Sequence, residues 1–103
     1  MTAGAPAAVR VRVPASLRAY TGGEPGVEVD LGSLGEKPTI GALLDHLATT
    51  HPDLERRLRD EQRQLRRHVN LFLGSDNVRD LADQETPLSA GTEVAVMPAV
   101  SGG

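Results

Sequence analysis

Two hydrophobic periods alternate along the chain, and their order constrains the fold more than any other feature of the sequence. Residues 9–13 and 27–31 alternate apolar with charged side chains at a period of two, which is typical of strands with one buried face. Residues 40–48 carry apolar side chains three and four positions apart, which predicts an amphipathic helix. The apolar stretches 68–73 and 92–98 predict further strands after the helix.

A helix with strands on both sides of it in the sequence packs most simply on one face of a mixed sheet. We therefore expect an α+β fold with four to five strands packed on one helical region. Residues 21–26 are expected to join the first two strands as a hairpin with an enlarged loop. Thr39 is the candidate N-cap of the helix, and Pro52 stops or restarts it. A brief strand is expected at 78–81, after a turn at 75–77.

With 103 residues the chain has the size of one domain with one core, and a single domain is expected over residues 1–103. Residues 1–7 are expected to form a disordered N-terminus, and residues 99–103 a flexible tail. No apolar run reaches the roughly 18 residues of a membrane span. Arg10 and Arg12 interrupt the region where a secretory signal would need an unbroken apolar segment, so the predicted location is cytoplasmic.

Composition argues against several kinds of chemistry. The chain has no cysteine, which excludes disulfides, thiolate metal sites and a cysteine nucleophile. Its aromatic residues are Tyr20 and Phe72 alone and its net charge is −3, so nucleic-acid binding is not expected. His46, His51 and His68 lack the spacing of a metal site. Because no phosphate-binding loop or nucleophile motif occurs, we predict a protein that is not itself an enzyme.

An arginine-rich segment stands out in the middle of the chain. Residues 55–67 hold six arginines against three acidic residues, so the segment carries +3 while the rest of the chain carries −6. The favoured interpretation is a solvated helix face with an apolar stripe through Leu65 and with pairs such as Glu55–Arg59 one turn apart. The alternative is a basic surface that docks another molecule.

The chain ends in Gly102-Gly103, directly after the last predicted strand. Pro98 favours an extended backbone where the tail begins. Glycine has no Cβ, so such a tail can enter a narrow active site of another protein. The terminal carboxylate of Gly103 is the group at this end that could react. The alternative is a frayed end without a chemical role.

Three segments resemble the ubiquitin-like (β-grasp) sulfur-carrier proteins, which include the small subunit of molybdopterin synthase, the thiamine-thiazole sulfur carrier and a carrier for cysteine synthesis. They are VRVRVP with TGG (9–14 and 21–23), HVNLFL with NVR (68–73 and 77–79), and GTEVAVMPAVSGG (91–103). The last is the most specific, although Ala99 and Ser101 stand where the molybdopterin members commonly have proline and alanine. The resemblance lies closest to the cysteine-synthesis type.

The resemblance implies a β-grasp fold and a carrier function. A partner adenylating (E1-like) enzyme would use ATP and Mg²⁺ to convert the Gly103 carboxylate to an acyl-adenylate. A sulfur donor would displace AMP and leave a thiocarboxylate, from which a downstream synthase takes sulfur for cysteine, molybdopterin, thiazole or a secondary metabolite. The carrier would bind no cofactor or metal of its own and act as a monomer or in a transient heterocomplex. The tail residues to be recognised are Pro98, Ala99, Val100, Ser101 and Gly102.

Strand parity predicts a surface for these partners. If Val69 faces the helix, Phe72 faces the opposite side of the sheet, and if Val96 faces inward, Ala95 and Met97 face outward. Should the two strands be neighbours, Phe72, Ala95 and Met97 would form an exposed apolar patch near the tail, suited to partner binding. The alternative is an inverted parity with Phe72 in the core.

A ubiquitin-like protein modifier, or an interaction module without a sulfur role, is the alternative function. Chains of a modifier are built on acceptor lysines, and the only lysine here is Lys37. Chain formation is therefore not expected, whereas attachment to other proteins stays open.

Overall fold

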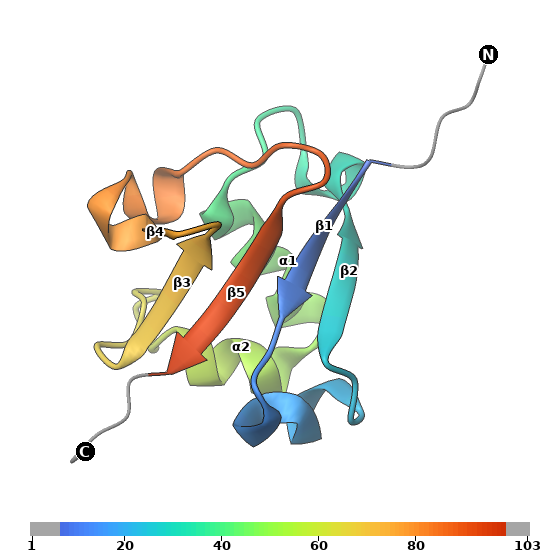
Figure 1. The fold of residues 1–103 in the computed structure, drawn as a ribbon, viewed down its shortest axis with the longest axis vertical. Coiled ribbons are helices and arrows are strands. Elements are labelled where there is room, and N and C mark those ends of the chain that lie inside the picture. Colours follow the sequence, from blue (N-terminus) through green and yellow to red (C-terminus); the bar gives the residue numbers. More distant parts are fainter. Residues whose placement is uncertain (1–6, 99–103) are drawn as a thin grey trace.

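A five-stranded mixed sheet organises the fold in the computed structural model, which describes residues 7–98 (Figure 1). The strand order is β2-β1-β5-β3-β4, with β1 parallel to β5 and the other neighbours antiparallel. The predicted α+β fold with a mixed sheet is therefore confirmed. The strands are β1 (Ala8–Arg12), β2 (Gly26–Asp30), β3 (Val69–Leu73), β4 (Asp76–Asn77) and β5 (Glu93–Pro98).

The first two strands form the predicted antiparallel hairpin, with Val9 opposite Val29. Their enlarged connection holds a 3-10 helix (η1, Ala15–Thr21) that the sequence pattern did not predict. Gly22 and Gly23 follow with φ of 66° and 88°, which is the left-handed backbone that glycine adopts without strain. The chain thereby reverses direction and enters β2.

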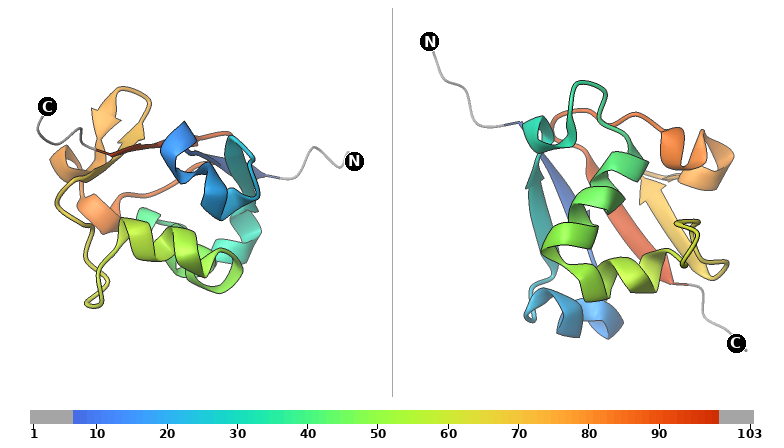
Figure 2. Two further views of the ribbon diagram at one scale, coloured as in Figure 1. Left: turned by 90° about the horizontal axis from the view of Figure 1, so that it is seen from below. Right: turned by 180° about the vertical axis from the view of Figure 1, so that it is seen from behind.

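Two helices cover one face of the sheet: α1 (Ile40–Thr50) and α2 (Pro52–Leu58) (Figure 2). Thr39 is the N-cap as predicted, because the Ala42 amide donates to its Oγ1 at 3.1 Å. Pro52 occupies the first turn of α2, where its missing N–H costs nothing, so it restarts the helix. Both sequence predictions for these helix ends are confirmed.

The core lies between the helices and the sheet. The inward side chains of β1 and β5 meet the apolar stripe of α1 and the leucines of α2. Each fully buried leucine or valine contributes roughly 1.5–3 kcal/mol from the removal of apolar surface from water. The side chains with less than 2% of their surface exposed are Val9, Val11, Val13, Ile40, Leu43, Leu44, Leu47, Leu54, Leu58, Leu71, Val78 and Val94.

The arginine-rich segment differs from the helix that its spacing predicted. Helix α2 ends at Leu58, and the chain turns back so that the Arg66 amide donates to the Leu58 carbonyl at 2.9 Å. This return also buries Leu65, which is 8% exposed. Leu58 and Leu65 therefore both pack in the core because the loop between them folds back. Their spacing of seven residues looks like a helical repeat but does not come from a helix.

The predicted Glu55–Arg59 pair exists, but it is buried and not solvated. Arg59 is 3% exposed, and its guanidinium donates to Glu55 (2.8 Å), Asp45 (2.9 Å) and Gln84 (3.1 Å). A planar fork of five N–H donors can satisfy three acceptors at once, which explains why an arginine is tolerated at this depth.

The brief strand expected at 78–81 is also wrong. This stretch begins with a 3-10 helix (η3, Val78–Asp80), and the short strand β4 lies at Asp76–Asn77, where a turn was expected. The cause is local: the Asn77 side chain accepts a hydrogen bond from the Arg79 amide at 3.0 Å, which caps the helical turn.

Candidate functional site

The last described residue, Pro98, ends strand β5 beside the first residue of β3, Val69. Strand β5 lies between β1 and β3 in the sheet, so both of its edges are paired. The side chains of Val94 and Val96 are 1% and 2% exposed on the inner face. A shift of one residue in the pairing of β5 would expose both side chains to solvent. Packing in the core therefore fixes the register of β5 and the position where the tail begins.

The five residues that follow are the centre of the functional prediction and lie outside the described residues. They are Ala99, Val100, Ser101, Gly102 and Gly103. The expected disordered N-terminus lies outside them as well, except for Ala7, whose carbonyl accepts the Leu31 amide at 2.8 Å. The structure therefore bears on the base of the tail and on the surfaces around it.

The outer face of the sheet, opposite the helices, brings together the three residues of the predicted patch. Phe72 pairs directly with Ala95, and Met97 pairs with Asn70 on the same face. Met97 is 49% exposed and Phe72 is partly exposed, so the predicted parity is confirmed. Ala95 also faces this side but is buried at 8% exposure, because its single methyl group lies below its longer neighbours. Phe72 and Met97 therefore supply the accessible apolar surface.

Polar groups border this apolar patch on two sides. On one side, Asn77 donates from Nδ2 to Oδ1 of Asn70 at 3.1 Å. On the other side is an exposed network in which nitrogen–oxygen distances are 3.7 Å for Arg10–Glu28, 3.9 Å for Arg10–Glu93 and 3.6 Å for Arg12–Glu93. Exposed pairs of this kind contribute little to stability, about 0–1 kcal/mol each. Their main effect is to give the outer face one charged half and one apolar half.

Arg79 belongs to the NVR segment of the family resemblance, but the sequence analysis gave it no role near the base of the tail. Its Nη2 donates to the carbonyls of Val69 (2.8 Å) and Arg66 (2.6 Å). Strand β4 pairs with β3 only at Phe72 and Leu73, so the guanidinium covers the edge of β3 that β4 leaves open. No periodicity or motif points to this contact, because it joins residues ten and thirteen positions apart.

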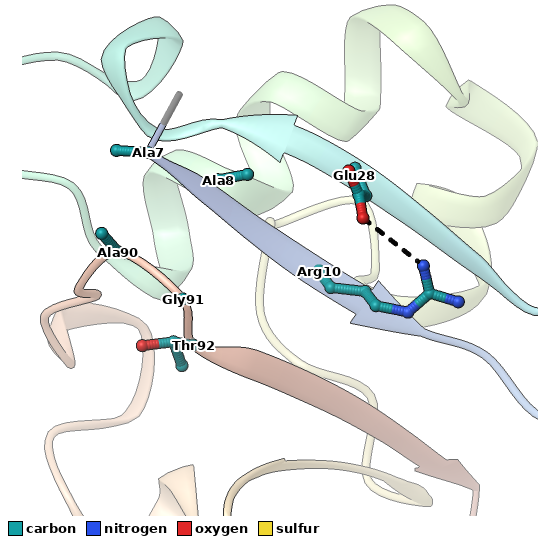
Figure 3. Close-up of a pocket in the computed structure, with 7 residues that line it drawn as sticks. All are labelled: Ala7, Ala8, Arg10, Glu28, Ala90, Gly91 and Thr92. Atoms are coloured by element: carbon teal, nitrogen blue, oxygen red, sulfur yellow. Dashed lines mark ion pairs between the residues drawn. The ribbon is translucent and has the colours of Figure 1, made fainter. Parts of the chain in front are cut away.

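A surface hollow of about 410 Å³ lies at the other end of β5 from the tail (Figure 3). It is lined by small residues of the β1 start and of the loop before β5, together with the Arg10–Glu28 ion pair. Among residues 7–98, no cluster of three histidine, cysteine or acidic side chains could hold a metal ion. No helix in this same range has the length and apolar character to cross a membrane.

Comparison with known proteins identifies the family. Residues 11–103 match the model of the ThiS family. The chain is 32% identical over 97 residues to the sulfur carrier protein CysO of Mycobacterium tuberculosis, an alignment that covers 92% of this chain and 98% of the relative.

Solved structures agree with this match. A chain of the Amycolatopsis orientalis BexX/CysO complex superposes with a TM-score of 0.76 at 30% identity, covering 92% of this chain and 99% of that one. The small archaeal modifier protein SAMP1 of Haloferax volcanii gives a TM-score of 0.74 at 30% identity, covering 93% and 99%. The chain thus belongs to the ThiS family of ubiquitin-like, β-grasp sulfur-carrier proteins.

Proposed function

We propose that the protein carries sulfur as a thiocarboxylate on its C-terminal residue, Gly103. The observation that supports this most strongly is the combination of a sulfur-carrier family match with a Gly-Gly terminus, five residues beyond a strand held in fixed register. A terminus placed in this way can extend from the folded body into the active site of another protein.

The chemistry runs in two steps on the main-chain carboxylate. An oxygen of Gly103 attacks the α-phosphorus of ATP, which forms the acyl-adenylate and releases pyrophosphate. Sulfur at the oxidation level of sulfide then attacks the carbonyl carbon, AMP leaves with the bonding electron pair, and the thiocarboxylate remains. Adenylation is needed because a carboxylate oxygen is a poor leaving group, whereas AMP is a good one.

An E1-like adenylating enzyme supplies the catalytic groups and binds ATP and Mg²⁺, in the cytoplasm where ATP is available. The carrier contributes the tail, from Pro98 to Gly103, and a surface to hold the partner. We assign that surface to the apolar patch of Phe72, Met97 and the buried Ala95, since exposed aromatic and methionine side chains are enriched where proteins bind each other.

A downstream synthase accepts the sulfur. The resemblance to the cysteine-synthesis type of carrier and the ending PAVSGG, in place of the PPVAGG common in molybdopterin carriers, favour cysteine synthesis over molybdopterin synthesis. Thiazole and secondary-metabolite synthesis are the other acceptor classes that the tail chemistry can serve.

The adenylation step is tested by ATP–pyrophosphate exchange with the adenylating enzyme of the same organism. We expect the full chain to support exchange and the chain lacking Gly103 to give none, because the reacting carboxylate then lies one residue short. The melting temperature of the shortened chain should be unchanged, since Gly103 follows the last strand by five residues. Exchange that persists without Gly103 would refute the site.

A protein modifier is the second candidate function, favoured by the 30% identity to SAMP1. A modifier would use the same adenylate, but a lysine amine of a target protein would displace AMP in place of sulfur. The two functions therefore differ in the bond formed at Gly103, thioacid or amide.

A further inference from the structure

The arginines of this chain fall into two groups by their partners. Five arginines have a carboxylate oxygen within ion-pair distance, namely Arg10, Arg12, Arg56, Arg59 and Arg63. Within residues 7–98, the other five have none: Arg18, Arg57, Arg66, Arg67 and Arg79. Arg18 donates to the Val13 carbonyl at 3.4 Å, and the Arg57 guanidinium lies 5.0 Å from the centre of the Tyr20 ring. The side chains of Arg66 and Arg79 instead donate to backbone carbonyls, and no carboxylate of residues 7–98 lies within ion-pair distance of them.

Three of these, Arg66, Arg67 and Arg79, are here called the tail-base arginines. Arg66 and Arg67 lie on the turn that leads into β3, and Arg79 binds the edge of β3. The carbonyls of Arg66 and Val69 both accept from Arg79, and Val69 stands opposite Pro98 in the sheet. Arg67 directly follows Arg66, is exposed, and makes no side-chain hydrogen bond to a described residue. Two distant parts of the chain thus bring positive charge to the start of β3, which lies beside the end of β5 (Figure 1).

The tail therefore has opposite charges at its two ends, a cationic base and an anionic carboxylate. Five residues span at most about 17 Å when extended, which is roughly twice the Debye length of about 8 Å at physiological salt. A partner that binds the tail in an extended form would therefore meet the two ends as separate charges.

An enzyme that adenylates the carboxylate must hold the anionic tail tip and the ATP phosphates, so its reacting centre is electropositive. The tail-base arginines would be repelled by such a centre and need the opposite charge around them. We propose that they dock on an acidic rim of the adenylating enzyme, at the mouth of the channel that takes the tail. This inference rests on the proposed function and adds the charge of the partner surface.

The experiment measures the dissociation constant between the carrier and its adenylating enzyme for Arg67→Glu, which disturbs no described contact. At a salt concentration of about 0.03 M we expect a roughly tenfold weaker complex, and at about 0.3 M a difference of about twofold or less, because salt screens exposed charges. Arg67→Lys, which keeps the charge, should bind like the wild type.

Lys37→Glu is the matched control, since it changes the net charge by the same amount. Pro38 accepts from the Leu88 amide in the loop before β5, so this segment lies at the opposite end of β5 from the tail. We expect Lys37→Glu to bind within twofold of the wild type. Equal weakening by the two reversals, or no weakening by Arg67→Glu, would overturn the docking surface.

These results are separate from a failure of the carrier function. If the wild type supports pyrophosphate exchange while Arg67→Glu binds normally, the acidic rim is wrong and the proposed function stands. If the wild type gives no exchange, the proposed function itself is wrong, and the docking inference falls with it.

Discussion

At the scale of single residues, Arg59 joins three separate elements through one buried guanidinium. It bonds to Asp45 of α1, Glu55 of α2 and Gln84 of a 3-10 turn that follows η3. Nε2 of the Gln84 side chain in turn donates to the Arg63 carbonyl at 2.7 Å. Among the described residues, no buried side-chain nitrogen or oxygen lacks a hydrogen-bond partner, so this network is complete.

We predict that Arg59→Met lowers the free energy of unfolding by about 3 kcal/mol, because it leaves the Glu55 carboxylate without its cation at a buried position. The Glu55 side chain is 13% exposed, so water compensates little. Urea unfolding monitored by circular dichroism measures the change. Arg63→Met is the control: Arg63 is 72% exposed and 3.6 Å from Asp45, so its loss should cost about 0.5 kcal/mol or less. An equal loss of unfolding free energy in both variants would contradict the special role of the buried Arg59 guanidinium.

Sequence reasoning reached the Glu55–Arg59 pair but not its environment. The spacing of four residues is visible in the sequence, whereas Asp45 and Gln84 approach only after the helices have packed. Whether a charged side chain is buried depends on such distant partners, which cannot be predicted from the local charge pattern.

At the scale of elements, the two faces of β3 and β5 have different tasks. Their inner residues, such as Val69 and Val96, build the core, while Phe72 and Met97 remain accessible on the outer face. Alternation with a period of two separates the side chains that pack in the core from those that stay accessible on the same strand. A substitution on the outer face can therefore change binding without unfolding the domain.

We predict that Phe72→Asp stays folded but weakens the complex with the adenylating enzyme at least tenfold, because a charge replaces the aromatic centre of the apolar patch. Titration calorimetry measures the affinity, and a thermal melt measures folding. Leu81→Asp is the control, since Leu81 is 48% exposed and lies outside the patch. Unfolding of Phe72→Asp, or equal weakening by Leu81→Asp, would remove the patch from the binding surface.

The main strands and α1 were predictable because each is long enough to show its hydrophobic period. Strand β4 could not be predicted in this way, since two residues define no period. The 3-10 helix η3 that follows it depends on a single hydrogen bond to the Asn77 side chain. Helix α2 was predicted to run too far because Leu65 returns to the core through a loop. The errors at β4 and at the end of α2 both arise where side-chain hydrogen bonds or tertiary contacts, and not local periodicity, determine the path of the chain.

At the scale of the whole molecule, the central strand of the sheet sets the point at which the C-terminal tail begins. The central strand β5 runs through the middle of the sheet and ends at Pro98, directly after Met97 of the apolar patch and opposite Val69, whose carbonyl accepts from Arg79. The chain has no cysteine, so sulfur cannot be carried on a thiol side chain. In the proposed function the main-chain terminus takes that role, and the folded body serves to position and identify it.

The most direct test is the intact mass of the carrier after incubation with ATP, its adenylating enzyme and a sulfide source. The account predicts a mass gain equal to the exchange of one oxygen for sulfur, located at Gly103 by fragmentation and absent when Gly103 is deleted. A chain that supports pyrophosphate exchange but shows no sulfur-for-oxygen mass gain, or whose Gly103 is found in amide linkage to a lysine, would contradict the sulfur-carrier function.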